Sequence, residues 1–295
     1  MRTLLEALND ANSRRQAVGH FNISEVAALN AILDVVRETR LPVIIGLSEG
    51  ERKFFGARQA AAVVRSIREE SDLEIYLDAD HTHSLRSAEE AARAGFDLIV
   101  FDASEKPFEE NVSLTKKAVE AAKSIRPEIL IEGEIGFIGS GSQLHDAPQT
   151  TLALTSPQEA VQFAQATRVD LLSPAVGTMH GMLPGMVRGE VHKHLNIERV
   201  AEIAKATGLY LTLHGGSGTA DNDFVRAIDA GLRIIHVNTE LRLAWRRGVE
   251  AALAADPKEV APYTLLTDAR SQIADVVRNR LLLFSRSAQA SAQPA

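Results

Sequence analysis

Eight short apolar runs alternate with helical patterns along the whole chain, and this alternation most limits what the chain can fold into. The runs are apolar at consecutive positions, as in parallel strands that are buried on both faces. Eight βα units in series favour a closed (β/α)8, or TIM, barrel, because an open sheet of that size usually splits into two halves. The predicted strands cover 17–22, 42–48, 74–80, 97–103, 129–136, 171–177, 209–215 and 233–239.

The segments between these runs carry helix start signals. Ser156 is a predicted N-cap, Pro157 occupies the first helical position and Glu159 completes a capping box. Two further helices are predicted beyond the eighth strand, around 240–255 and 267–283. The barrel is therefore expected to carry extra C-terminal helices.

Composition narrows the class of protein and the kinds of site. The 295 residues are 45% hydrophobic and carry a net charge of −7, which argues against a nucleic-acid surface because such a surface needs a basic stripe. With no cysteine, any transition metal must be held by histidines and carboxylates. No apolar run approaches the roughly 20 residues of a membrane span, and the N-terminus does not read as a signal peptide. We expect a soluble, cytoplasmic protein with no membrane partner.

No segment rich in Pro, Gly or Ser marks a domain boundary. We therefore expect one domain over residues 1–284. The final stretch, 285–295, is polar and rich in small residues, which predicts a disordered tail.

Polar residues gather at the carboxyl ends of the predicted strands. An ionisable group is costly there unless it is paired or binds a metal, and this rim of a barrel is where active sites lie. Three histidines, His81, His180 and His214, end strands three, six and seven; one alone would favour a structural role, but three favour a catalytic zinc site with an open position. Asp80 precedes His81 and is expected to point to the other side of the strand locally, yet it can reach the same substrate if the strand ends there.

The chain resembles the class II fructose-bisphosphate and tagatose-bisphosphate aldolases over about residues 4–284. The order, spacing and strand-end positions of several segments carry the resemblance. They are FNISEVAALNAIL, SEGERKFFG, LDADHTHSL, AGFDLIVFDAS, ENVSLTKKAVE, IEGEIG, PAVGTMHG, LHGGSG and VNTELRLAW.

The resemblance implies reversible, zinc-dependent cleavage of a ketose phosphate, with fructose 1,6-bisphosphate giving dihydroxyacetone phosphate and glyceraldehyde 3-phosphate. The three histidines match the family's zinc ligands, and Asp80 matches its general acid/base, which must take the C4 hydroxyl proton. Zn²⁺ suits this chemistry as a Lewis acid. Glu132 matches an acidic residue near the metal, and Glu134 supports it. A homodimer or homotetramer is also implied.

The resemblance also assigns the substrate contacts. A backbone cradle for the phosphate, with a monovalent cation (Na⁺ or K⁺) nearby, is expected from four residues, because glycine lets backbone N–H groups approach a phosphate closely. Arg242 matches an arginine that binds the distal phosphate in fructose-bisphosphate members, where tagatose-bisphosphate members tend to carry lysine. The cradle residues are Gly181, Gly215, Gly216 and Ser217, and the other expected contacts are Asn22, Ser48, His236, Asn238, Thr239 and Arg242.

Two departures keep the sugar specificity open. His236 stands where the family usually has an asparagine, and an imidazole is bulkier and can carry charge near neutral pH. The loop after Glu134 lacks the family's acidic pattern, leaving Gln143, His145 and Asp146 as candidate replacements. A tagatose-bisphosphate or other ketose-phosphate aldolase with altered specificity is therefore an alternative.

Two further readings belong to other classes. His81 and His83 form a His-x-His pair, as in metal-dependent hydrolases, but those enzymes carry the pair on the first strand and this one lies on the third. A barrel that binds a sugar phosphate without cleaving it is the other rival. Asp80 argues against it, since a pure binding protein needs no carboxylate beside the metal.

Overall fold

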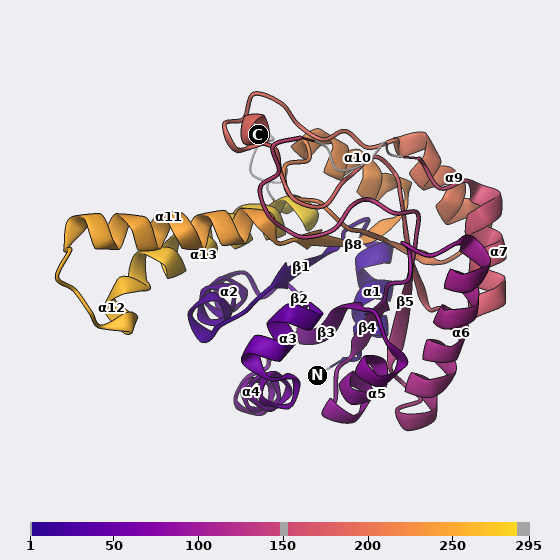
Figure 1. Cartoon of the computed structure of the whole chain (residues 1–295), viewed down its shortest axis with the longest axis horizontal. Helices are drawn as coiled ribbons and strands as arrows, with labels where there is room; N and C mark the ends of the chain where they lie inside the picture. Colours follow the sequence, from indigo (N-terminus) through magenta and orange to yellow (C-terminus); the bar gives the residue numbers. More distant parts are fainter. Residues whose placement is uncertain (1, 148–152, 288–295) are drawn as a thin grey trace.

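A closed barrel of eight parallel strands, in the order β1 to β8, forms the centre of the molecule (Figure 1). The structure is a computed structural model and describes residues 2–147 and 153–287. The predicted (β/α)8 fold is confirmed, with every predicted strand overlapping an observed one. The strands are β1 (Val18–Asn22), β2 (Val43–Gly46), β3 (Ile75–Thr82), β4 (Leu98–Phe101), β5 (Leu130–Ile135), β6 (Leu171–Pro174), β7 (Tyr210–Leu213) and β8 (Leu232–Val237).

Helices surround the barrel and cover the outward faces of the strands (Figure 1). The capping box that the sequence predicts at Ser156 is present, with Pro157 at the first helical position of α7. The helices are α1 (Leu4–Ser13), α2 (Val26–Thr39), α3 (Glu49–Phe55), α4 (Ala57–Glu70), α5 (Leu85–Ala94), α6 (Phe108–Ile125), α7 (Pro157–Thr167), α8 (Pro184–Val187), α9 (Ile197–Thr207), α10 (Asp221–Ala230), α11 (Thr239–Ala255), α12 (Pro262–Leu265) and α13 (Thr267–Phe284).

The barrel interior changes from apolar to polar along most of its strands. At the amino end, Ile44, Tyr76 and Leu130 belong to a small core that the first helix, α1, closes with Leu4 and Leu8. Side chains of a strand alternate between its faces, so the positions two and four residues further on also point inward, and they are polar after Tyr76 (Asp78, Asp80) and after Leu130 (Glu132, Glu134). The polar half of the interior therefore faces the carboxyl ends of the strands, where the barrel is open.

The two predicted C-terminal helices are α11 and α13, and with α12 they project from the barrel as an arm (Figure 1). α13 packs on both α11 and α2, and so ties the arm to the barrel wall. Most of the predicted tail, residues 288–295, lies outside the described residues. The tail's first residue, Ser285, is buried, and its carbonyl oxygen accepts a hydrogen bond of 2.6 Å from Gln16. Within the described residues, no helix is long and apolar enough to span a membrane.

Candidate active site

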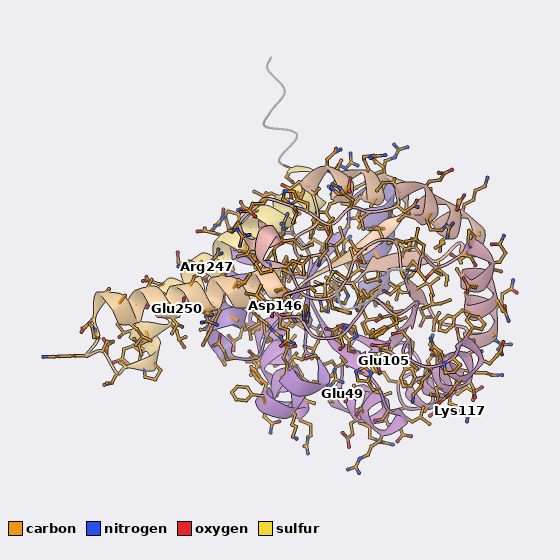
Figure 2. All side chains as sticks on the ribbon, turned by 45° about the horizontal axis from the view of Figure 1, so that its top comes forward. Glu49, Glu105, Lys117, Asp146, Arg247 and Glu250 are labelled. Carbon is orange, nitrogen blue, oxygen red and sulfur yellow. The ribbon has the colours of Figure 1, made fainter. Side chains whose placement is uncertain are left out.

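A cleft of about 440 Å³ opens at the carboxyl end of the barrel and leads into a narrow inner pocket. In Figure 2, Glu49 and Glu105 lie near its mouth, while Arg247 and Glu250 lie away from it on α11. Of the site residues that the resemblance assigns, all but Glu132 and Glu134 line one of these two spaces. The residues that line them are Asn22, Ser48, Asp80, His81, His180, Gly181, His214, Gly215, Gly216, Ser217, His236, Asn238, Thr239 and Arg242.

Three imidazoles and one carboxylate converge at the floor of the cleft. The nearest ligand atoms of His81, His180, His214 and Glu134 all lie within 4.8 Å of one another, with His81 Nε2 3.1 Å from His214 Nδ1. Glu134 Oε2 is buried without a hydrogen-bond partner among the described residues, 3.5 Å from His81 Nδ1. A carboxylate oxygen left bare beside three imidazoles is a costly arrangement that a cation would relieve. These residues therefore fit a divalent metal.

Glu132 and Glu134 take different places. Glu132 lies deeper, where its carboxylate accepts hydrogen bonds from His214 Nε2 at 2.8 Å and from the Thr212 hydroxyl at 2.7 Å. This bond leaves His214 Nδ1 to face the cluster. Asp102 orients His81 in the same way, with its Oδ2 2.9 Å from His81 Nδ1. Carboxylates that orient ligand histidines in this manner are common around metal sites.

A local irregularity of β3 turns two consecutive side chains into the cleft. The pairing of β3 with β4 shifts register between Ala79 and Thr82, and His81 has a φ of 43° in the left-handed region. Alternation along a regular strand would send Asp80 and His81 to opposite faces. The bulge instead places Asp80 Oδ1 3.8 Å from His81 Nε2.

Charge neighbours set the ionisation of these groups. Burial opposes the charge on Asp80, but His81 and His236 hold the pKa of its carboxyl well below its usual range. Burial also lowers the pKa of His81, yet Asp80, Asp102 and Glu134 raise it well above its usual value. Burial and Asp102 raise the pKa of Glu134 to about 8 in the metal-free protein. Asp80 is thus ionised, which is the state that a general base requires.

Comparison with known proteins identifies the family. The model of the family "Fructose-bisphosphate aldolase class-II" matches residues 2–289. The chain belongs to the class II fructose-bisphosphate aldolase family. It is 35% identical over 291 residues to a "Probable fructose-bisphosphate aldolase" of Bacillus subtilis, covering 98% of this chain and 99% of that protein. It is 32% identical to a "Fructose-bisphosphate aldolase" of Geobacillus stearothermophilus, covering 98% of each chain.

A solved structure agrees with this class II aldolase assignment. The crystal structure of the YdjI aldolase from Escherichia coli K12 superposes with a TM-score of 0.81 at 26% identity, covering 98% of this chain and 100% of that one. The resemblance that the sequence motifs indicate is thereby confirmed at the level of family and fold. Membership of this family also argues against a metal-dependent hydrolase. The His83 imidazole is largely exposed and lies outside the cluster of His81, His180, His214 and Glu134, where it hydrogen-bonds the Asp102 carbonyl at 2.9 Å.

The aldolase site contains a histidine stack that the sequence reasoning missed. His236 lies between His20 and His214, with ring centroids 3.5 Å and 3.9 Å away, and His236 Nδ1 lies 3.5 Å from Asp80 Oδ1. His20 in turn bonds Asp78 at 2.9 Å. The signal was present in the sequence, because Asp78 and Asp80, like His20 and Asn22, are two residues apart and so share the inward face.

Arg242 and Asn22 meet on one buried carboxylate, Glu51, which was not among the predicted site residues. Glu51 accepts 2.6 Å and 2.9 Å hydrogen bonds from Arg242 and Asn22, and Ser48 donates to it at the start of α3. Arg242 also donates to the Ser142 carbonyl at 2.9 Å. Arg242, the residue expected to bind the distal phosphate, is thus half exposed at the cleft wall, and both terminal nitrogens of its guanidinium are hydrogen-bonded.

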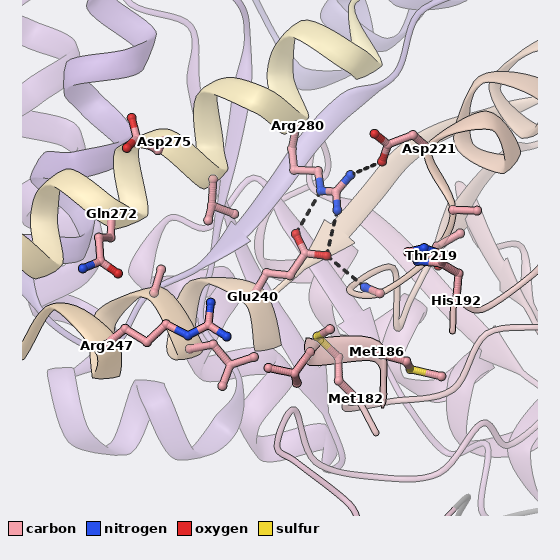
Figure 3. A pocket seen from close by; sticks show the side chains of 16 residues that line it. Met182, Met186, His192, Thr219, Asp221, Glu240, Arg247, Gln272, Asp275 and Arg280 are labelled. Carbon is pink, nitrogen blue, oxygen red and sulfur yellow. Dashed lines mark hydrogen bonds and ion pairs between the residues drawn. The ribbon is translucent and has the colours of Figure 1, made fainter. Parts of the chain in front are cut away.

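The glycine turn after β7 already uses part of its backbone. The Gly216 N–H donates to the His236 carbonyl at 3.2 Å and the Gly218 N–H donates to Glu240 at 2.9 Å. Glu240 lines a groove of about 620 Å³, where Arg280 also binds it (Figure 3). Any phosphate cradle therefore depends on the remaining groups of the turn.

The loop after β5 pairs with the loop after β6. The Met182 N–H donates to Gln143 and the His145 N–H donates to Met182, both at 3.0 Å. Neither Gln143, His145 nor Asp146 lines the cleft or the inner pocket as the structure describes them. The rest of the predicted loop, 148–151, lies outside the described residues.

Proposed function

We propose that the chain catalyses reversible, zinc-dependent aldol cleavage of a ketose bisphosphate, with fructose 1,6-bisphosphate as the leading substrate. The products are dihydroxyacetone phosphate and glyceraldehyde 3-phosphate. The observation that carries the proposal is the Asp80 carboxylate, 3.8 Å from a histidine of the metal-ligand cluster and lining the open cleft. Family membership supports the reaction class.

The metal would be held by His81, His180 and His214, with Glu134 as an alternate ligand. When bound, it would supply Lewis acidity toward the substrate's carbonyl and hydroxyl oxygens. Three imidazole ligands, in a chain without cysteine, favour zinc over softer or harder metal ions. Glu132 and Asp102 would keep two of the ligand imidazoles in the required tautomer.

Asp80 would take the proton of the C4 hydroxyl, and in the reverse direction would return it. Its second oxygen, Oδ2, is held by Asn22 at 2.8 Å, so the carboxylate has one oxygen fixed and the other, Oδ1, left for the substrate. His236 lies 3.5 Å from that free oxygen. This contact supports a role for His236 in positioning the sugar, and is the reason that other ketose phosphates stay as alternative substrates.

At the two ends of the sugar, Gly181, Gly215 and Ser217 would receive one phosphate, and Arg242 the other. Gly216 would shape the turn, and Ser48, Asn238 and Thr239 would complete the pocket wall. A guanidinium suits a phosphate because it donates two parallel hydrogen bonds.

The chemistry is tested by two variants and one panel of substrates. Asp80→Ala is expected to lower kcat by ~10³-fold while the protein keeps its zinc, because loss of a general base has that order of effect. His180→Ala is expected to lose both turnover and zinc. Cleavage is followed through dihydroxyacetone phosphate with fructose and tagatose bisphosphates and ketose monophosphates, and zinc is measured by elemental analysis.

These measurements, with a chelation test added, also distinguish the proposed aldolase from the alternative functions. Activity that survives chelation would remove the metal from the mechanism. Binding of sugar phosphates without cleavage of any of them would favour the non-enzymatic barrel. Zinc retained by His180→Ala would overturn the ligand assignment.

We also infer a homodimer or homotetramer in the cytoplasm. The projecting arm exposes large apolar side chains, Val260 at 84% and Tyr263 at 83%, where a partner would cover them. Light scattering coupled to gel filtration measures the mass, and a monomer at all concentrations would contradict the inference.

A further inference from the structure

Lys193 is a buried cation whose charge the proposed reaction does not use. It lies in the polar loop between α8 and α9, between two exposed histidines, yet only 4% of its surface is accessible. Its backbone pairs with the turn after β7, since the Lys193 N–H donates to Gly218 at 2.9 Å and its carbonyl accepts from Ala220 at 3.2 Å. This pairing directs the side chain beneath the active site, whereas the groove of Figure 3 lies beside the same turn.

The Lys193 ammonium is bound by three backbone carbonyls. Nζ donates to the oxygens of Met179 at 2.7 Å, Gly181 at 2.6 Å and Gly215 at 2.8 Å. An ammonium has three N–H donors, so all three are used. Among the described residues, Lys193 forms no ion pair with a carboxylate, and the convergence of carbonyl oxygens on one charge resembles the way that proteins hold a bare monovalent cation.

These three carbonyls flank the proposed metal ligands. Met179 and Gly181 stand on either side of His180, and Gly215 follows His214. The two turns approach so closely that a Cβ on Gly215 would lie 2.4 Å from the Met179 oxygen. Carbonyl dipoles that point at one spot repel one another unless a positive charge lies between them. The cation at this spot therefore fixes the spacing of the two histidine-bearing turns.

Burial lowers the pKa of Lys193 to about 7, and Glu240 acts in the opposite direction. The carbonyl cage requires the protonated form, because a neutral amine would turn its lone pair toward an acceptor oxygen. The geometry thus favours the ammonium at the same point where burial disfavours it.

We infer that the Lys193 ammonium serves as a built-in monovalent cation beside the phosphate cradle, so that the enzyme needs no free Na⁺ or K⁺ there. Where it is measured through catalysis, the inference rests on the proposed aldolase function. Lys193 is on this view a positioning residue: it acts through the turns that carry His180 and His214, without touching the substrate.

The first test uses the unmodified protein. Zinc-loaded enzyme is assayed with fructose 1,6-bisphosphate in tetramethylammonium buffer, and then with KCl, NaCl or NH₄Cl at constant ionic strength. We expect kcat/KM to change by less than ~2-fold, because the Lys193 ammonium already occupies the site that a free cation would fill. Strong activation by K⁺ or Na⁺ would overturn the inference.

The second test removes the ammonium in two ways. Lys193→Ala leaves a space lined by the three carbonyls, and Lys193→Met fills it with an apolar chain. We expect both to lose ~10- to 100-fold in kcat/KM, and only Lys193→Ala to recover with K⁺, NH₄⁺ or butylammonium, saturably and not with tetramethylammonium. Lys205→Met, an exposed lysine on α9, is the matched control and should behave as the unmodified protein.

A third measurement does not depend on activity. The Tm of zinc-loaded Lys193→Ala should rise with KCl at constant ionic strength, while the Tm of the unmodified protein should not, since a ligand that binds only the folded state stabilises it. If the unmodified protein cleaves no ketose phosphate but this Tm difference appears, the proposed function fails and the cation inference stands. Equal rescue by all salts, or full activity of both variants, would contradict it.

Discussion

His20 and His236 stack face to face inside the barrel, with ring centroids 3.5 Å apart and planes within 10° of parallel. They are register partners on β1 and β8, the two strands whose pairing closes the barrel. The stack exists only because β2 carries Gly46, where a Cβ would lie 2.1 Å from the His20 ring.

Gly46→Ala is therefore expected to destabilise the protein by about 1–3 kcal/mol, because the His20 ring must leave its place in a packed interior. Thermal unfolding measures the effect. Gly50→Ala on α3 is the control: a Cβ there meets nothing within 4 Å, so the helix should gain up to about 1 kcal/mol. Equal Tm values for Gly46→Ala and the unmodified protein would show that the stack is not constrained.

His236→Asn should move substrate preference toward fructose 1,6-bisphosphate. The change restores the residue usual in the family and frees the space between His20 and His214 next to Asp80. The measurement is the ratio of kcat/KM values across the ketose phosphate panel. His192→Asn, at an exposed histidine that lines neither the cleft nor the inner pocket, is the control and should leave this ratio unchanged. An unchanged ratio in His236→Asn would remove this residue from the specificity determinants.

Metal binding should release protons near neutral pH. In the metal-free protein burial and Asp102 raise the pKa of Glu134 to about 8, so at pH 7 this carboxyl is protonated and must lose its proton to reach a metal. His81, despite burial, also has a pKa raised well above its usual value by Asp80. About two protons should leave per zinc, and zinc affinity should rise with pH up to about 8.

Calorimetry in two buffers of different ionisation enthalpy measures this release. Glu134→Gln cannot lose a proton and should release about one fewer. A zinc-binding enthalpy that is the same in both buffers would contradict the assignment of the metal to this cluster.

Arg242→Ala should weaken binding of bisphosphates selectively. Loss of a guanidinium that grips one phosphate is expected to raise KM by ~10-fold for a ketose bisphosphate, with little effect on a ketose 1-phosphate. Glu51 keeps its hydrogen bonds from Asn22 and Ser48, so the cleft wall should persist. Arg246→Ala, on the same helix and paired with Glu250, is the control. Equal KM changes for both substrate classes would indicate a structural role.

The sequence determined the barrel, because strand-length apolar runs separated by amphipathic helices bury their surface in few other ways. It also placed His81, His180 and His214 at strand ends, and strand ends of one barrel meet at one rim whatever the loops do. Residue identity thus sufficed to predict that these three histidines lie together, as the structure shows.

Only the tertiary structure decided the finer arrangement. Asp80 and His81 both reach the cleft because of a bulge in β3, which no alternation pattern reveals. Lys193 lies between two histidines in the sequence, which says nothing of its burial, and its three carbonyl partners come from turns that folding alone brings together. Hydrogen bonds between distant turns depend on loop closure, and so their partners cannot be read from local sequence.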